Sequence, residues 1–198
     1  MGRRLRICLL VAHYPPNASG AERQAQAQAR ELARRGHDVH VLTSAVAGWP
    51  PDADEDGVSV HRWAKATRWG PLFGLTFVAH LVRSLAKLHA AVPFEILHTH
   101  QAMWEAVAAG LARSWIPEVP TLLQPASAGY YGEAEELSRT RGFPLLRVLV
   151  LRNTHVSAIS QEIEDQWRRL GFPSERITRT RSGVDTTRFR PGPSQLDA

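Results

Sequence analysis

The chain has 198 residues, a length that fits one sizeable α/β core and is short for two. Its hydrophobic content of 43% excludes an intrinsically disordered chain. No apolar run approaches the roughly 20 residues of a membrane-spanning helix. The net charge of +5 is carried mostly by arginine, but no arginine run alternates with aromatic residues. We therefore expect no nucleic-acid partner. The single cysteine, Cys8, excludes an internal disulfide.

A basic N-terminus followed by the apolar residues 7–12 is similar to a secretory signal peptide. The apolar run is short for that role, because His13, Tyr14 and two prolines follow at once. We interpret residues 5–11 as a buried first strand that includes Cys8. A lone buried thiol fits a reducing compartment, so the expected location is cytoplasmic.

Strands and helices alternate along the rest of the chain. Further strands are predicted over residues 37–43, 58–63, 95–100, 120–124, 155–159 and 176–181. Helices are predicted over residues 21–35, 71–91, 103–115, 143–152 and 160–170. This alternation is typical of βαβ units. The predicted fold class is therefore α/β: a Rossmann-like, doubly wound, mainly parallel sheet with helices on both faces.

Two segments allow more than one interpretation. Residues 49–57 form an acidic stretch that begins like a calcium loop, but Trp63 stands where a bidentate glutamate is required. We interpret this stretch as an acidic loop in which Asp56–Gly57 is a turn between two strands. The helix at 71–91 carries an apolar stripe. The stripe is expected to face the core, and contact with a membrane surface through this basic amphipathic helix is the alternative.

The loop after the first strand contains Ser19, Gly20 and Glu22. Gly20 lacks a Cβ, so a ligand can approach its backbone closely, and a helix N-terminus favours a phosphate. The simpler interpretation is a turn in which Ser19 caps the helix and Glu22 lies in its first turn. Taken alone, the loop does not decide between the two.

Two histidines, His98 and His100, lie two residues apart at the carboxyl end of a predicted strand. This spacing puts both on one face of the sheet, at the edge where open α/β sheets bind ligands. They are either a ligand site or a pair of hydrogen-bonded buried histidines. A metal site requires a third ligand nearby, and no such pattern is present, so we expect no metal.

The order of four motifs resembles the N-terminal domain of family-4, or group 1, retaining glycosyltransferases of the GT-B fold. These motifs are P-P-N-A-S-G-A-E (15–22), L-A-R-R-G-H-D-V-H-V (32–41), E-I-L-H-T-H (95–100) and S-G-V-D-T-T-R-F-R-P (182–191). The resemblance extends from Leu5 to Pro191. Ser19 departs from it by replacing the first glycine of the family's G-G-x-E. Gln124 and Ala126 depart by standing where many members have threonine and histidine.

The resemblance implies transfer of a sugar, of hexosyltransferase type, from a nucleotide diphosphosugar to an acceptor with retention of configuration. Ser19, Gly20 and Glu22 would form the donor diphosphate loop, and His100 would contact the transferred sugar. His98, Gln124 and Ser127 would support the strand end or the acceptor. The nucleotide sugar is a co-substrate, so neither a cofactor nor a metal is expected.

The resemblance also implies a domain division. Residues 1–191 would form the acceptor-side domain and residues 192–198 the start of a linker, with a C-terminal donor-binding domain absent. This part alone is then expected to be inactive. The acceptor would be a glycan, a lipid or a small molecule, and peripheral contact with the inner face of the membrane is a further expectation. The alternative function is a stand-alone module that binds a glycan, a nucleotide or a protein partner without catalysis.

Overall fold

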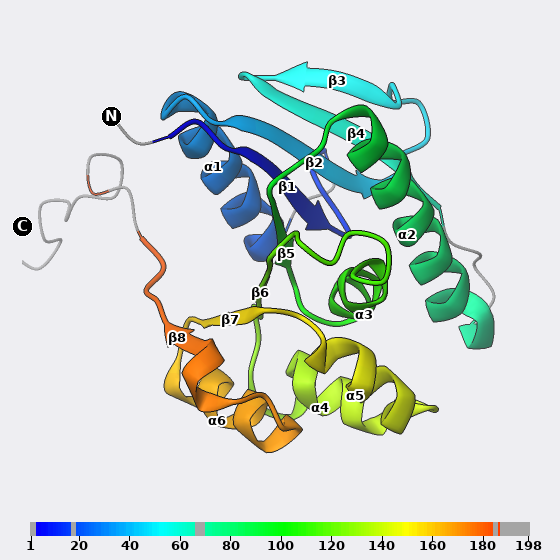
Figure 1. The fold of residues 1–198 in the computed structure, drawn as a ribbon, viewed down its shortest axis with the longest axis vertical. Helices are drawn as coiled ribbons and strands as arrows, with labels where there is room; N and C mark the ends of the chain where they lie inside the picture. The colour runs from blue at the N-terminus through cyan, green and yellow to red at the C-terminus, as the bar shows by residue number, and fades with distance from the viewer. Residues whose placement is uncertain (1–2, 17–18, 66–69, 184–185, 187–198) are drawn as a thin grey trace, which may run out of the picture.

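The computed structural model describes residues 3–16, 19–65, 70–183 and 186, which form one eight-stranded sheet covered by helices (Figure 1). The strand order is β3-β4-β2-β1-β5-β6-β7-β8, and every pair is parallel except β3 with β4. The strands are β1 (Arg6–Val11), β2 (Asp38–Ser44), β3 (Asp52–Glu55), β4 (Val58–Ala64), β5 (Ile96–His100), β6 (Thr121–Gln124), β7 (His155–Ala158) and β8 (Ile177–Arg179). The predicted α/β fold class is confirmed.

Six α-helices connect these strands within the described residues. They are α1 (Gly20–Arg34), α2 (Phe73–Ala91), α3 (Trp104–Ala112), α4 (Glu133–Arg139), α5 (Phe143–Leu151) and α6 (Gln161–Leu170). Short 3₁₀ helices occur at Gly70–Leu72, Gly129–Tyr131 and Ser174–Arg176.

The chain winds in two directions from the centre of the sheet. From β1 it passes to β2, then to β3 at one edge of the sheet, and then to β4 between β3 and β2. It then returns to β5 on the other side of β1 and continues to β8. Strands β1 and β5 are therefore the point where the strand order reverses, and Val11 of β1 pairs with His100 of β5. In open α/β sheets such a point forms a ligand crevice at the carboxyl ends of the strands.

Each face of the sheet has its own core. On one face, Leu9 and Val11 pack with Val41 of β2 and with Ala25 and Ala29 of α1. The fully buried apolar side chains of α1 are the alanines Ala25 and Ala29, which allow this helix to lie close to the sheet.

On the opposite face, Leu10 packs in a larger core to which α2 through α6 all contribute. Figure 1 shows α1 separated from α2 and α3 by the strands. In the predicted apolar stripe, Val78, Leu81, Leu85 and Leu88 are buried in this core, whereas Leu72 is 48% and Leu75 70% exposed. The core-facing interpretation is therefore confirmed from Val78 onward and wrong for the start of the stripe.

Helix boundaries follow the residues that favour them. Ser19 and Glu22 form a capping box at the start of α1. The hydroxyl of Ser160 accepts a hydrogen bond of 3.2 Å from the backbone N–H of Ile163 at the start of α6. Helix α6 ends at Gly171, which adopts a φ of +105° that favours glycine.

The predicted Asp56–Gly57 turn between two strands is confirmed. The expectation of a loop throughout 49–57 was wrong, because part of this segment is the strand β3, which pairs antiparallel with β4 across the turn. Its acidic sequence has low strand propensity, but charge is common on edge strands because it prevents further pairing. Helix α4 was not predicted, because its seven residues are too few for a clear helical period. Residues 17–18 and most of the final motif, from 184 to the expected domain boundary at 191, lie outside the described residues.

Candidate functional site

The N-terminus of α1 lies directly after β1, at the point where the strand order reverses. The buried carboxylate of Glu22 accepts hydrogen bonds from the backbone N–H of Ser19, at 2.8 Å, and from the Ser19 hydroxyl. Burial opposes its ionisation, but these hydrogen bonds prevail and hold the pKa of Glu22 below its usual range. The capping interpretation of Ser19 and Glu22 is confirmed. As at the start of any α-helix, the first backbone N–H groups of α1 have no partners inside the helix itself.

Gly20 is exposed, and nothing lies within 4 Å of the position that a Cβ would occupy. The backbone at the start of α1 is therefore open to an approaching anionic group.

Gln101 connects this loop to the end of β5. Its side chain donates a long hydrogen bond of 3.4 Å to Glu22, and its backbone has a φ of +63°, which is uncommon for a residue other than glycine. His13, which follows β1, is exposed, and it lines the same cavity as Gln101. The loops after β1 and β5 therefore meet through Glu22 and Gln101.

Both histidines of β5 face α1, as their spacing predicts. The Nε2 atom of His98 lies 3.1 Å from Oε1 of Gln124, and that of His100 lies 3.1 Å from Oε1 of Gln28 on α1. Gln28 in turn donates to Gln124 at 3.3 Å. Because an amide oxygen only accepts, each ring nitrogen is the donor. The four side chains form one network between α1, β5 and β6.

Burial keeps both imidazoles neutral. It lowers the pKa of His98 to about 4, against the opposing effect of the hydrogen bond to Gln124. Burial, assisted by the charge of His98, lowers the pKa of His100 to about 3. At neutral pH these rings therefore donate hydrogen bonds without carrying a positive charge.

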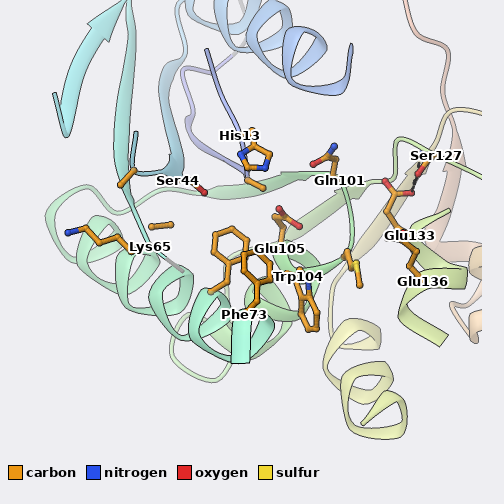
Figure 2. A pocket seen from close by; sticks show the side chains of 15 residues that line it. His13, Ser44, Lys65, Phe73, Gln101, Trp104, Glu105, Ser127, Glu133 and Glu136 are labelled. Atoms are coloured by element: carbon orange, nitrogen blue, oxygen red, sulfur yellow. Dashed lines mark hydrogen bonds between the residues drawn. The ribbon is translucent and has the colours of Figure 1, made fainter. Parts of the chain in front are cut away.

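A cavity of about 630 Å³ opens at the carboxyl ends of the strands on the α2 and α3 side of the sheet (Figure 2). One wall is aromatic and is formed by Phe73 and Phe77 of α2 and Trp104 of α3. Glu105 is buried between this wall and the pair His13 and Gln101 (Figure 2). Carboxyl groups on α4 line the side opposite Lys65.

Glu133 holds the loop that follows β6. Its carboxylate accepts hydrogen bonds from the backbone N–H groups of Ala126 at 2.8 Å and Ser127 at 3.1 Å, and from the Ser127 hydroxyl at 2.9 Å. Ser127 therefore lies in the cavity, apart from His98 and Gln124. Those two line a second hollow, of about 510 Å³, on the α1 face. The structure thus divides the predicted supporting residues between the two faces of the sheet.

Sequence reasoning missed Gln28, Gln101, Glu105 and Glu133. Only Gln101 carried a usable signal, because it directly follows a strand that ends in a histidine pair. Among the residues that the structure describes, no group of three or more His, Cys, Asp or Glu side chains is arranged to hold a metal ion. None of the described helices is both long enough and apolar enough to cross a membrane.

Residues 19–183 match the glycosyl transferase 4-like domain family, and the chain belongs to this family. The match covers α1, the histidine pair and the lining of the cavity except Ala12 and His13. No curated protein sequence matches the chain.

Several solved structures share the fold. Sucrose-phosphate synthase from Thermosynechococcus elongatus has a TM-score of 0.74 at 18% identity, and the match covers 96% of this chain and 51% of that one. Anabaena HepE in complex with UDP-glucose has a TM-score of 0.62 at 16% identity, covering 96% of this chain and 47% of HepE. UDP-N-acetylglucosamine 2-epimerase from Rickettsia bellii has a TM-score of 0.61 at 8% identity, covering 91% and 45%. The chain thus spans about half the length of these proteins, and it has the GT-B-type Rossmann-like fold.

Proposed function

We propose that this chain is the acceptor-side domain of a glycosyltransferase that moves a hexose from a nucleotide diphosphosugar to an acceptor with retention of configuration. The observation that carries the proposal is the junction of β1 and β5, where the open helix N-terminus at Gly20 faces a strand that ends in two neutral histidines. The family match and the UDP-glucose complex of HepE support the choice of donor. A second domain would supply the rest of the donor site, and this domain alone would be inactive.

The chemistry follows from this arrangement. The bond between the anomeric carbon and the diphosphate oxygen breaks, a bond to the acceptor oxygen forms on the same face of the sugar, and the proton of the acceptor hydroxyl passes to the leaving diphosphate. Negative charge develops on the leaving diphosphate, and the backbone N–H groups at the start of α1 stabilise it. The one N–H of the neutral His100 ring is donated to Gln28, so His100 would contact the sugar through Nδ1, which accepts a hydrogen bond from a sugar hydroxyl. No metal or cofactor takes part.

The assignment of His100 can be tested with the complete enzyme. We expect His100→Ala to lower the turnover of UDP-glucose by about 100-fold or more, because a group that positions the transferred sugar is lost. His100→Gln should retain part of the activity, because a neutral amide can still donate to Gln28. His80→Ala is the comparison, because His80 is exposed on α2 and does not line the cavity. Normal turnover in His100→Ala, or an equal loss of turnover in His80→Ala, would refute the assignment.

Gly20→Val tests the diphosphate loop in the same assay. The added side chain meets no protein atom within 4 Å of its Cβ, so the fold should be unaffected. The Michaelis constant for UDP-glucose should rise, because the side chain occupies the space that the diphosphate needs. Unchanged donor kinetics would exclude this loop from the donor site.

A further inference from the structure

The cavity on the α2 and α3 side combines two kinds of wall that rarely meet on a basic protein. The aromatic wall consists of Phe73, Phe77 and Trp104, and the rings of Phe73 and Phe77 stack with centroids 5.5 Å apart. The acidic wall consists of Glu105, Glu133 and Glu136. The chain as a whole has a net charge of +5, so this concentration of carboxyl groups is local.

Among the described residues, none of these three carboxyl groups forms an ion pair. Glu133 accepts three hydrogen bonds from Ala126 and Ser127. Glu105 is 3% exposed and accepts a hydrogen bond from the backbone of Ala12. Burying a carboxylate without a countercharge is costly, so a ligand that supplies positive charge would favour the ionised form of Glu105.

Aromatic faces add to the same preference. A cation over the face of tryptophan or phenylalanine is attracted by the negative face of the ring. An aromatic wall opposite carboxyl groups therefore suits an ammonium group attached to an apolar body, whereas a phosphate or carboxylate would face the carboxyl groups of α4. A cavity of about 630 Å³ is large enough for such a small molecule.

We propose that this cavity binds an acceptor that carries a protonated amine beside an apolar body, with the ammonium group held between Glu105, Glu136 and the aromatic wall. This inference rests on the proposed function, because it names the class of acceptor. The cavity selects cationic acceptors over neutral ones and excludes phosphorylated ones.

The pH dependence of binding provides a specific signature. Burial, followed by the charges of Glu133 and Glu22, raises the pKa of Glu105 to about 8, so this carboxyl group is mostly neutral at pH 7. A bound cation favours its ionised form. Affinity for a permanent cation should therefore rise as the pH rises towards 8 and above. The other titratable side chains around Glu105 are His13, Glu22, Lys65, Glu133 and Glu136.

The test measures binding of three probes of similar size to the 198-residue chain. They are benzyltrimethylammonium, benzyl alcohol and benzenesulfonate, which are cationic, neutral and anionic at every pH used. NMR titration of the Trp104 indole N–H locates the site. We expect benzyltrimethylammonium to bind about tenfold more tightly than the alcohol at pH 8.5, and the sulfonate to bind weakest. The affinity for benzyltrimethylammonium should rise about tenfold between pH 6.5 and pH 8.5.

Matched variants assign the effect to the cavity. Glu105→Gln should remove the pH dependence, and Glu136→Gln should weaken binding several-fold. Glu118→Gln, at an exposed position away from the cavity, should change neither the affinity for benzyltrimethylammonium nor its pH dependence. If Glu105→Gln does not fold, the affinity of the Glu136 variant and the order in which the three probes bind still test the proposal.

Equal or tighter binding of benzenesulfonate would overturn the inference, as would a pH dependence that persists in Glu105→Gln. UDP-glucose turnover in the complete enzyme is measured separately. If the turnover of UDP-glucose is normal but the chain does not prefer the cation, only the acceptor class is refuted. If product formation does not depend on UDP-glucose, the proposed function is refuted.

Discussion

Two neutral histidines at the end of β5 illustrate how burial decides the chemistry of single residues. His98 and His100 have the sequence spacing of a ligand pair, but each donates to a glutamine and lies beneath α1. Their rings lie 4.5 Å apart, so a charge on one would repel a charge on the other. The network therefore occupies the one N–H that each neutral ring has, which leaves the other ring nitrogen as an acceptor.

These histidines should make the folded state sensitive to acid. Their pKa values in the folded chain, about 4 and about 3, lie below the ordinary value of 6.5. Below pH 6.5 the unfolded chain therefore binds protons that the folded chain refuses, and stability present above pH 6.5 is lost as the pH falls. We expect each histidine to account for a loss of about 2 kcal/mol by pH 4.5.

Urea denaturation between pH 7 and pH 4.5 measures this effect. His98→Gln should reduce the acid-dependent loss of unfolding free energy relative to the original chain. His80→Gln, a change at an exposed histidine of α2, should not alter it. An identical loss in His98→Gln and the original chain would show that His98 is not held neutral.

At the scale of elements, the helices α3 and α5 pack with almost no space between them. A Cβ added at Gly110 of α3 would lie 1.9 Å from the backbone oxygen of Leu149 on α5. Asn153 supports the same contact by donating a 2.9 Å hydrogen bond to the backbone oxygen of Ala106. Close approach of two backbones is thus the reason for a glycine inside this helix.

Gly110→Ala should therefore destabilise the fold although alanine is the better helix former. The gain in helix propensity is about 1 kcal/mol, whereas separating two packed helices costs about 3 kcal/mol. The midpoint of thermal unfolding should fall. Gly70→Ala is the matched control, because nothing lies within 4 Å of its Cβ position. A midpoint unchanged in Gly110→Ala would mean that α5 shifts without cost.

At the scale of the whole molecule, a single sheet separates two cores. Neighbouring residues of β1 contribute to different cores: Leu9 packs on the α1 side and Leu10 on the α2 and α3 side. Both are fully buried. Because β1 lies in the middle of the sheet, each core depends on the position of this one strand.

Leu9→Ala and Leu10→Ala should each lower the free energy of unfolding by about 2–5 kcal/mol. Each variant should still unfold in a single transition, because the shared sheet couples the cores. Tryptophan fluorescence and far-UV circular dichroism should report the same midpoint. Two separate midpoints in either variant would show that the two halves of the sheet unfold independently.

Local patterns in the sequence were sufficient for much of the fold. Alternating apolar segments predicted the parallel strands, and Ser19 predicted where α1 begins, because capping depends on neighbouring residues alone. The spacing of His98 and His100 predicted their common face for the same reason. The motif order identified the family to which the chain belongs.

Only the tertiary structure decided which of these residues meet. Gln28 lies 72 residues from His100, and Glu133 belongs to a short helix without a clear period, yet each is bonded to a predicted site residue. The strand β3 exists because β4 offers it an edge, not because its acidic sequence favours extension. The aromatic and acidic walls of the cavity come from α2, α3 and α4, whose positions are set by crossovers between strands. Contacts of this kind depend on the packing of distant segments, and no local pattern encodes them.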